Sequence, residues 1–218
     1  RVFRLEDCTP PLPGIMPELF TYASNLLIKT SPMLDLTEGV QKLGNVREVH
    51  VVGLRNEVRE LLWWIQRGYG GGTARVALDL KFPDMPLRFT AEEESGTEVK
   101  FSMPGAYLYE PNASVLKAGG FKTVAQRFGL SKMHLHTHLC TSDKLVPFPG
   151  RRFRILKALP YKPGKLPFRK ANVSARNFPE SVATIRKRNR IKDGGDAYLF
   201  FVRVWDESLQ VLHCEPTG

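Results

Sequence analysis

Lysine and arginine side chains gather in one stretch of the chain, at a density suited to binding a polyanion. Between Arg151 and Lys192 there are fourteen lysines and arginines and a single acidic residue, Glu180. This stretch carries about +13 while the whole chain carries +10, so the remainder sums to about −3. Because each neutralised phosphate releases counterions, such a concentration favours RNA or DNA as partner. The alternative is a solvated basic face without a dedicated partner.

Two expected strands and one expected helix position these cations. Apolar residues alternate with basic ones over residues 152–159 and 170–176, which indicates two strands. A helix is predicted from Pro179, ended by Gly194-Gly195. The helix dipole accounts for one or two cations near its end, but not for five. We therefore predict phosphate contacts, which position a partner without reading its sequence, from Arg151, Arg152, Arg154, Lys170, Arg176, Arg186, Lys187, Arg188, Arg190 and Lys192.

Aromatic residues of the same stretch have two interpretations. Phe153, Tyr161, Phe168 and Phe178 could stack on bases, as aromatic side chains do in RNA-binding proteins. Core packing is the favoured interpretation for each of them, because they follow the apolar alternation of the expected strands.

A second group of chemically capable residues is His134, His136, His138 and Cys140, spaced two apart. Imidazole and thiolate are zinc ligands, and His213-Cys214 could complete such a site. Neighbouring positions on one strand face stand ~6.5–7 Å apart, however, so at most two adjacent ones share a tetrahedral metal. We expect a polar strand face and no metal site. No catalytic residues are assigned, since neither a Ser-His-Asp or Cys-His pairing nor paired carboxylates have recognisable spacing.

Three further motifs have mainly structural interpretations. The triple glycine Gly70 to Gly72 is predicted to stop a helix and to form a linker, since a nucleotide-binding loop would follow a strand. Gly119-Gly120 falls inside a predicted helix, where each glycine costs about 1 kcal/mol, so close packing is expected there. The polar residues from Tyr109 to Asn112, with Lys117, are interpreted as a helix start.

Composition sets the protein class. The 218 residues are 42% hydrophobic and 25% charged, as in soluble globular proteins. No apolar run reaches the ~18–20 residues of a membrane span. Three widely spaced cysteines favour a reducing, cytosolic compartment over a disulfide framework. The chain opens at Arg1 directly before strand-like residues 2–5, from which we expect a piece of a longer protein.

The first half of the chain predicts an α/β sheet. Leu26 to Ile28 is expected to be a buried strand of a parallel sheet, followed by a helix over 37–43 and a strand over 46–52. A helix from Asn56, with Val58, Leu61, Leu62 and Ile65 on one face, would complete a βαβ pattern. Residues 74–82 and 87–93 are predicted to form a hairpin.

The second half predicts smaller modules. The next module opens at residues 107–111 and continues into one helix over about 113–128, and residues 133–140 alternate as a strand. The basic strands and helix follow, and residues 197–205 and 209–214 form a last hairpin around Asp206 to Ser208.

Several long motifs, taken in order, resemble one known family. Residues 1–10 (RVFRLEDCTP), 27–35 (LIKTSPMLD) and 48–52 (EVHVV) are similar to the later part of a class I S-adenosylmethionine-dependent methyltransferase domain. Residues 107–119 (YLYEPNASVLKAG), 138–143 (HLCTSD) and 148–151 (FPGR) resemble its ferredoxin-like module. Residues 176–179 (RNFP) and 192–196 (KDGGD) resemble its THUMP-like domain.

This resemblance implies a fold class of α/β and α+β. Residues 1–95 would be the end of a Rossmann-like methyltransferase sheet, 96–146 a small ferredoxin-like module and 147–218 a THUMP-like α+β domain. It also implies a bacterial, cytoplasmic protein, without a membrane partner, that methylates RNA, with ribosomal or transfer RNA as the partner.

The same resemblance implies that S-adenosylmethionine serves the full-length protein and not this chain. The family's glycine-rich cofactor loop and its Asp-Pro-Ala-Arg segment belong upstream of Arg1, in a catalytic N-terminal half. We therefore expect RNA binding and positioning from this chain, and neither cofactor binding nor methylation by the chain alone. The alternatives are a non-enzymatic RNA-binding module and a part of a small-molecule methyltransferase.

Overall fold

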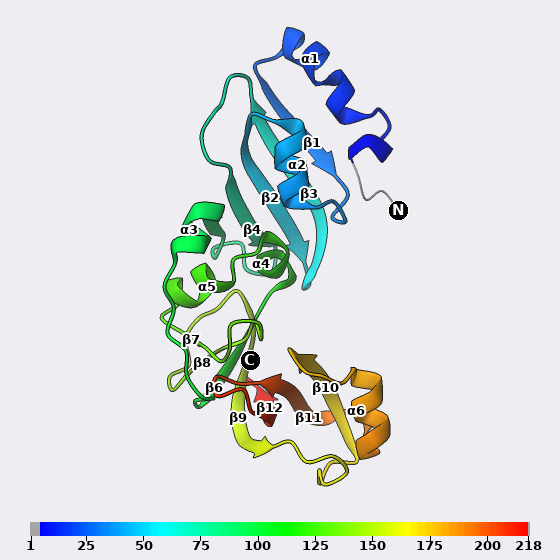
Figure 1. The fold of residues 1–218 in the computed structure, drawn as a ribbon, viewed down its shortest axis with the longest axis vertical. Coiled ribbons are helices and arrows are strands. Elements are labelled where there is room, and N and C mark those ends of the chain that lie inside the picture. The colour runs from blue at the N-terminus through cyan, green and yellow to red at the C-terminus, as the bar shows by residue number, and fades with distance from the viewer. Residues whose placement is uncertain (1–4, 218) are drawn as a thin grey trace. The chain divides into compact units, whose positions relative to one another are not determined.

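The computed structural model describes residues 5–217, and the chain divides into two compact units, each built on its own sheet (Figure 1). Unit 1 comprises residues 1–97 and 112–124, and unit 2 comprises residues 98–111 and 125–218. The strand expected over residues 2–5 falls almost entirely outside the described residues. Within residues 5–217, no helix combines the length and the apolar character that crossing a membrane requires.

Unit 1 is a five-stranded mixed sheet in the order β1-β3-β2-β4-β5. Strands β2 and β4 run parallel, and the other neighbours are antiparallel. The strands are β1 (Asn25–Thr30), β2 (Val46–Leu54), β3 (Glu57–Gln66), β4 (Ala74–Asp79) and β5 (Leu87–Thr90). The helical segments up to the end of this unit are η1 (Leu5–Asp7), α1 (Leu12–Tyr22), α2 (Leu36–Leu43), α3 (Ala91–Gly96), α4 (Ala113–Ala118) and α5 (Phe121–Arg127).

The helix predicted from Asn56 is wrong, because that segment is strand β3. Arg55 and Asn56 have φ values of 54° and 63°, and such a pair of left-handed residues makes the tight turn of a hairpin. Leu61, Trp63 and Ile65 then alternate into the core, each 0% exposed. Apolar side chains at both helical and alternating spacing made the sequence ambiguous, and the turn residues decide for the hairpin. The expected βαβ unit is therefore a β-hairpin.

The strand at Leu26 to Ile28 exists, but its predicted burial in a parallel sheet is wrong. It is β1, an edge strand that pairs antiparallel with β3. Leu27 is 71% exposed, while Leu26 and Ile28 are half-buried, because successive side chains of a strand point to opposite faces of the sheet and one face of β1 is open to solvent. By contrast, the predicted helix over 37–43, the strand over 46–52 and the hairpin of β4 and β5 are confirmed.

The single helix predicted over 113–128 is two helices, α4 and α5. Gly119, at φ 82°, ends α4 in the left-handed conformation that glycine adopts without strain. A side chain on Gly120 would lie 2.8 Å from Leu87 and Phe89, which confirms close packing there. The predicted helix start is confirmed as well, because the Asn112 side chain accepts a hydrogen bond from the Val115 amide at 2.9 Å.

Unit 2 is a seven-stranded sheet in the order β10-β11-β12-β9-β6-β8-β7, with helix α6 (Val182–Asn189). Strands β10 and β11 run parallel and the other neighbours are antiparallel. Two apolar clusters form its core, one around Phe153 and Phe200 and one around Ile185 and Phe201. The strands are β6 (Tyr107–Pro111), β7 (Ser131–Lys132), β8 (Cys140–Ser142), β9 (Gly150–Pro160), β10 (Lys170–Arg176), β11 (Lys192–Arg203) and β12 (Leu209–Pro216).

Two predictions for unit 2 are wrong. Residues 133–139 form a turn and loop between β7 and β8, with His138 at φ 53°, and not a strand. Helix α6 begins after its cap Ser181, whose hydroxyl accepts from the Thr184 amide, rather than at Pro179. It ends at Arg190, while Gly194-Gly195 lies inside β11.

The remaining predictions for unit 2 are confirmed. The two basic strands are β9 and β10, and the last hairpin is β11 with β12. Phe153 is buried in the first of the two apolar clusters, and Tyr161, Phe168 and Phe178 pack against the second, as the favoured interpretation expected. Two mixed sheets with helices confirm the fold class as α/β and α+β.

Candidate nucleic-acid interface

Exposed cations from different parts of the sequence lie close together at the end of α6. The Gly164 amide donates to the Asn189 side chain at 2.9 Å, so the loop before β10 lies against the end of α6. The Lys192 amide donates to the Arg169 carbonyl at 2.9 Å, which joins the starts of β10 and β11. We call the exposed cations of this edge the cationic rim: Lys162, Lys165, Arg169, Lys170, Lys187, Arg190 and Lys192.

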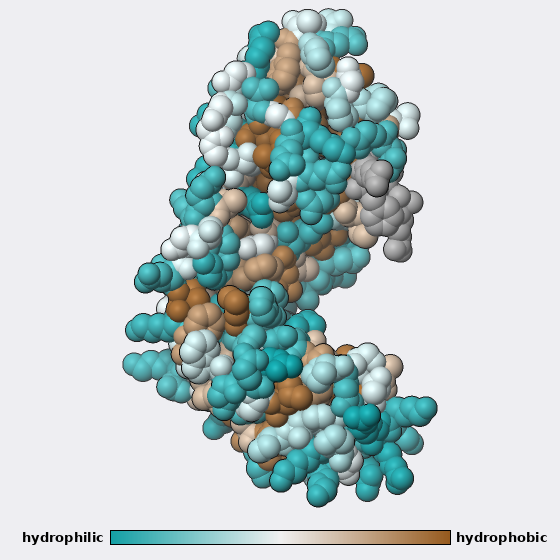
Figure 2. Space-filling model, in the orientation of Figure 1, coloured by the Kyte–Doolittle hydropathy of each residue, from teal (hydrophilic) through white to brown (hydrophobic). Residues whose placement is uncertain are grey.

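The seven side chains of the cationic rim have no ion pair with the described residues 5–217, so no neighbouring acid offsets their positive charge. Two neighbouring acids, Asp193 and Glu180, are engaged by Arg186 and Arg188 instead. Asp196 is a further exposed acid, in β11. The surface over α6 and the loop before β10 is mainly hydrophilic in Figure 2. Unpaired exposed cations on one edge are the arrangement that binds phosphates.

Arg186 and Arg188 were predicted as phosphate contacts, and both have structural partners. Arg186 contacts Asp193 at 2.5 Å and donates to the Ala171 carbonyl at 3.2 Å, with only 21% of its side chain exposed. Arg188 contacts Glu180 at 2.8 Å. The bonds of Arg186 tie α6 to β10 and β11, and the bond of Arg188 ties α6 to the segment just before the helix. A guanidinium that already has a counterion gains less from a phosphate.

Arg151 and Arg176, also predicted contacts, converge on one buried carboxylate. Glu110 on β6 has a side chain that is 4% exposed. Arg151 Nε donates to its Oε2 at 2.6 Å, and Arg176 Nη2 donates to its Oε1 at 2.7 Å. The side chains of Arg151 and Arg176 remain 44% and 40% exposed, respectively. The trio carries a net charge of +1 and fixes β6, β9 and β10 to one another.

The two remaining predicted contacts lie on β9. Arg154 lies 3.7 Å from Glu215, in an exposed pair, and Arg152 is partly buried. Because they alternate with buried Phe153, the two arginines point to the face of β9 opposite the core. Sequence reasoning therefore placed Lys170, Lys187, Arg190 and Lys192 in what is now the cationic rim. It missed Lys162, Lys165 and Arg169, because their loop has no periodicity that would assign them to a face.

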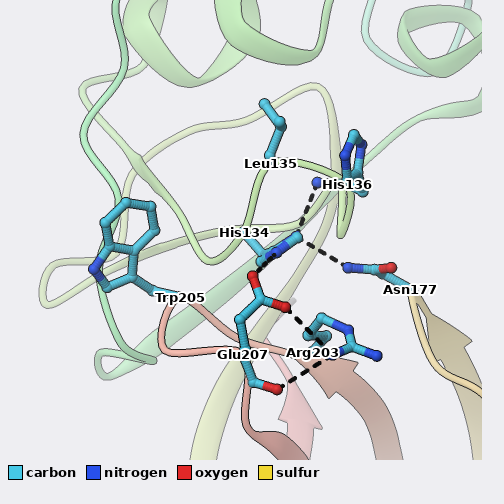
Figure 3. Close-up of a pocket in the computed structure, with 7 residues that line it drawn as sticks. All are labelled: His134, Leu135, His136, Asn177, Arg203, Trp205 and Glu207. Carbon is cyan, nitrogen blue, oxygen red and sulfur yellow. Dashed lines mark hydrogen bonds and ion pairs between the residues drawn. The ribbon is translucent and has the colours of Figure 1, made fainter.

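A pocket of about 450 Å³ lies elsewhere in unit 2 (Figure 3). Its centre is His134, in the loop where a strand had been predicted. His134 Nδ1 accepts from the His136 backbone amide at 3.1 Å, and His134 Nε2 lies 2.8 Å from Glu207 Oε1. This hydrogen bond to His134 holds the pKa of Glu207 below its usual range. The pocket is lined by His134, Leu135, His136, Asn177, Arg203, Trp205 and Glu207.

The histidines do not form a metal site in this structure. Within residues 5–217, no three histidine, cysteine or acidic side chains lie close enough to share a metal ion. No disulfide joins the cysteines. Burial raises the pKa of the Cys140 and Cys214 thiols to about 12, so neither is a thiolate at neutral pH.

Two features of the described part of unit 1 differ from those that hold a nucleotide-type cofactor such as S-adenosylmethionine. Gly70 to Gly72 connects strand β3 to strand β4, and a phosphate- or nucleotide-binding glycine loop leads into a helix instead. A pocket of about 370 Å³ at the end of β1 has no carboxylate in its lining to hold ribose hydroxyls. Its lining consists of Cys8, Thr9, Pro10, Leu12, Lys29, Thr30 and Ser31.

The comparisons agree with this architecture. Residues 107–149 match a ferredoxin-like domain, and residues 150–216, which contain the cationic rim, match a THUMP domain-like family. The chain thus carries a ferredoxin-like domain followed by a THUMP-like domain. No curated protein sequence matches the chain.

One solved structure is similar over the whole chain. It is the crystal structure of a candidate methyltransferase from Porphyromonas gingivalis W83, with 34% sequence identity and a TM-score of 0.90. The match covers 100% of this chain and 57% of that one. The chain therefore spans a little over half the length of the protein it resembles.

Proposed function

We propose that this chain is the RNA-binding portion of an RNA methyltransferase that uses S-adenosylmethionine. The observation that carries the proposal is the cationic rim, whose seven exposed side chains have no ion pair in residues 5–217 and lie on the THUMP-like domain. The name of the P. gingivalis protein supports methyl transfer as the activity of the whole protein. The rim would hold the RNA backbone and so position a nucleotide for the catalytic groups, which lie outside these 218 residues.

The proposal predicts salt-dependent RNA binding by the chain itself. Each single-strand phosphate contact contributes about 0.7 to the slope of log affinity against log salt. Four to seven contacts would weaken binding by roughly 50- to 1,000-fold between 50 and 200 mM salt. Fluorescence anisotropy with a labelled single-stranded RNA measures this slope. Absent or salt-independent binding would contradict the proposal and favour a small-molecule methyltransferase.

The proposal also places the cofactor outside this chain. Isothermal titration of S-adenosylmethionine into the chain is expected to give no binding at about 100 μM, because the pocket at the end of β1 has no carboxylate to hold ribose hydroxyls. The full-length protein provides the positive control. Micromolar binding to the chain alone would show that this part of the proposal is wrong.

A further inference from the structure

The pocket around His134 differs from the cationic rim in its charge and in its apolar content. Arg203 and Glu207 form an ion pair at 3.3 Å, so the charges of these two lining residues offset each other. Leu135 and Trp205 line it while 50% and 54% exposed. A neutral, partly apolar pocket with hydrogen-bonding groups suits an uncharged planar group better than a phosphate.

Trp205 is presented as a flat platform. Its ring stacks on Phe101 with centroids 4.8 Å apart and planes 14° from parallel. Phe101 thereby supports one side of the indole, while more than half of Trp205 stays exposed. An exposed aromatic ring that is already oriented is the feature on which unpaired bases stack.

Polar groups lie across the pocket from this platform. In Figure 3, Trp205 lies to one side of His134, and His136 and Asn177 lie to the other. The Asn177 amide is 2.9 Å from His134 Nδ1, and Glu207 is held between His134 and Arg203. Amide and carboxylate groups of this kind pair with the edges of a base.

We propose that this pocket binds an unpaired nucleobase of the RNA held by the cationic rim. The inference rests on the proposed function and adds a specific subsite to it. Asn177 directly follows β10, whose first residue, Lys170, belongs to the rim. Seven residues of strand span ~20 Å, so one RNA strand can contact the rim with its phosphates and the pocket with a base. Arg176, beside Asn177, keeps 40% of its side chain exposed along that path.

The test separates base binding from phosphate binding. The probes are a single-stranded RNA and an abasic phosphodiester strand of equal length, both titrated into the full 218-residue chain. The wild-type chain is expected to bind the base-bearing strand about tenfold more tightly, the effect of one stacked base. Trp205→Ala should reduce this ratio to about twofold or less, and Trp205→Phe, which keeps an aromatic face, should retain most of it.

Binding of the abasic strand serves as the internal control for folding. A Trp205→Ala chain with wild-type affinity for the abasic strand is folded, and its lost ratio then supports the pocket. An unchanged ratio in that variant, or a wild-type ratio near one, overturns the nucleobase site while salt-dependent binding still supports the proposed function. If neither strand binds, both proposals are wrong.

Discussion

Replacing Lys165, Lys170 and Lys192 with glutamate is expected to weaken RNA binding by about 100-fold at 50 mM salt. Three exposed cations of the cationic rim are lost, and three anions that repel phosphate take their places. The slope of log affinity against log salt should fall by about two units, since each contact contributes about 0.7. None of the three lies in α6, so the variant avoids placing an acid at the negative end of the helix.

The matched control places the same change of net charge in unit 1. Arg55, Arg67 and Lys81 are also exposed cations, and glutamate at these positions alters the overall charge equally. The control variant should lose less than about fivefold in affinity, because none of its three cations belongs to the cationic rim that is expected to contact the phosphates. Equal losses in the two variants would show that net charge, and not the rim, attracts the RNA. Both variants should unfold within about 0.5 kcal/mol of the wild type, as exposed substitutions do.

Replacing Glu110 with glutamine is expected to lower the free energy of unfolding of unit 2 by about 2 kcal/mol. Removing one partner of a buried ion pair costs about 3–5 kcal/mol, because the other charge stays behind without compensation. The loss is smaller here, since Arg151 and Arg176 keep 44% and 40% of their surfaces in water. Urea unfolding followed by fluorescence measures the change.

Glu215→Gln is the matched control for Glu110→Gln. Glu215, on β12, pairs at 3.7 Å with Arg154, which lies on β9 as Arg151 does. The side chains of Glu215 and Arg154 are 48% and 63% exposed. Such a pair contributes about 0–1 kcal/mol. If both substitutions lower the free energy of unfolding equally, Glu110 does not clamp the arginines as the geometry indicates.

The sequence by itself determined the features that depend on local pattern. The strands β2, β9 and β10 follow from alternating apolar residues, and the start of α4 follows from Asn112 and the residues after it. The concentration of positive charge in the last third was also visible, because it is a property of composition and not of folding. These features need only neighbouring residues, so a pattern can specify them.

Tertiary structure decided which of two allowed patterns the chain adopts. The apolar residues after Asn56 fit a helix and a strand equally well, and the hairpin turn at Arg55-Asn56 with the pairing of β3 to β1 and β2 selects the strand. The pairing of β3 with β1, which is distant in sequence, leaves no local signal.

Tertiary structure also decided which cations have no acidic partner within the fold and can therefore bind phosphate. Glu110 is 41 residues from Arg151 and 66 from Arg176, and its burial between them gives these two predicted phosphate contacts a structural role in addition. The loop from Tyr161 to Arg169 brings three further cations to the end of α6 that no periodicity indicated. Counterions and neighbours are set by contacts across the fold, so composition can predict a basic surface but not the residues that form it.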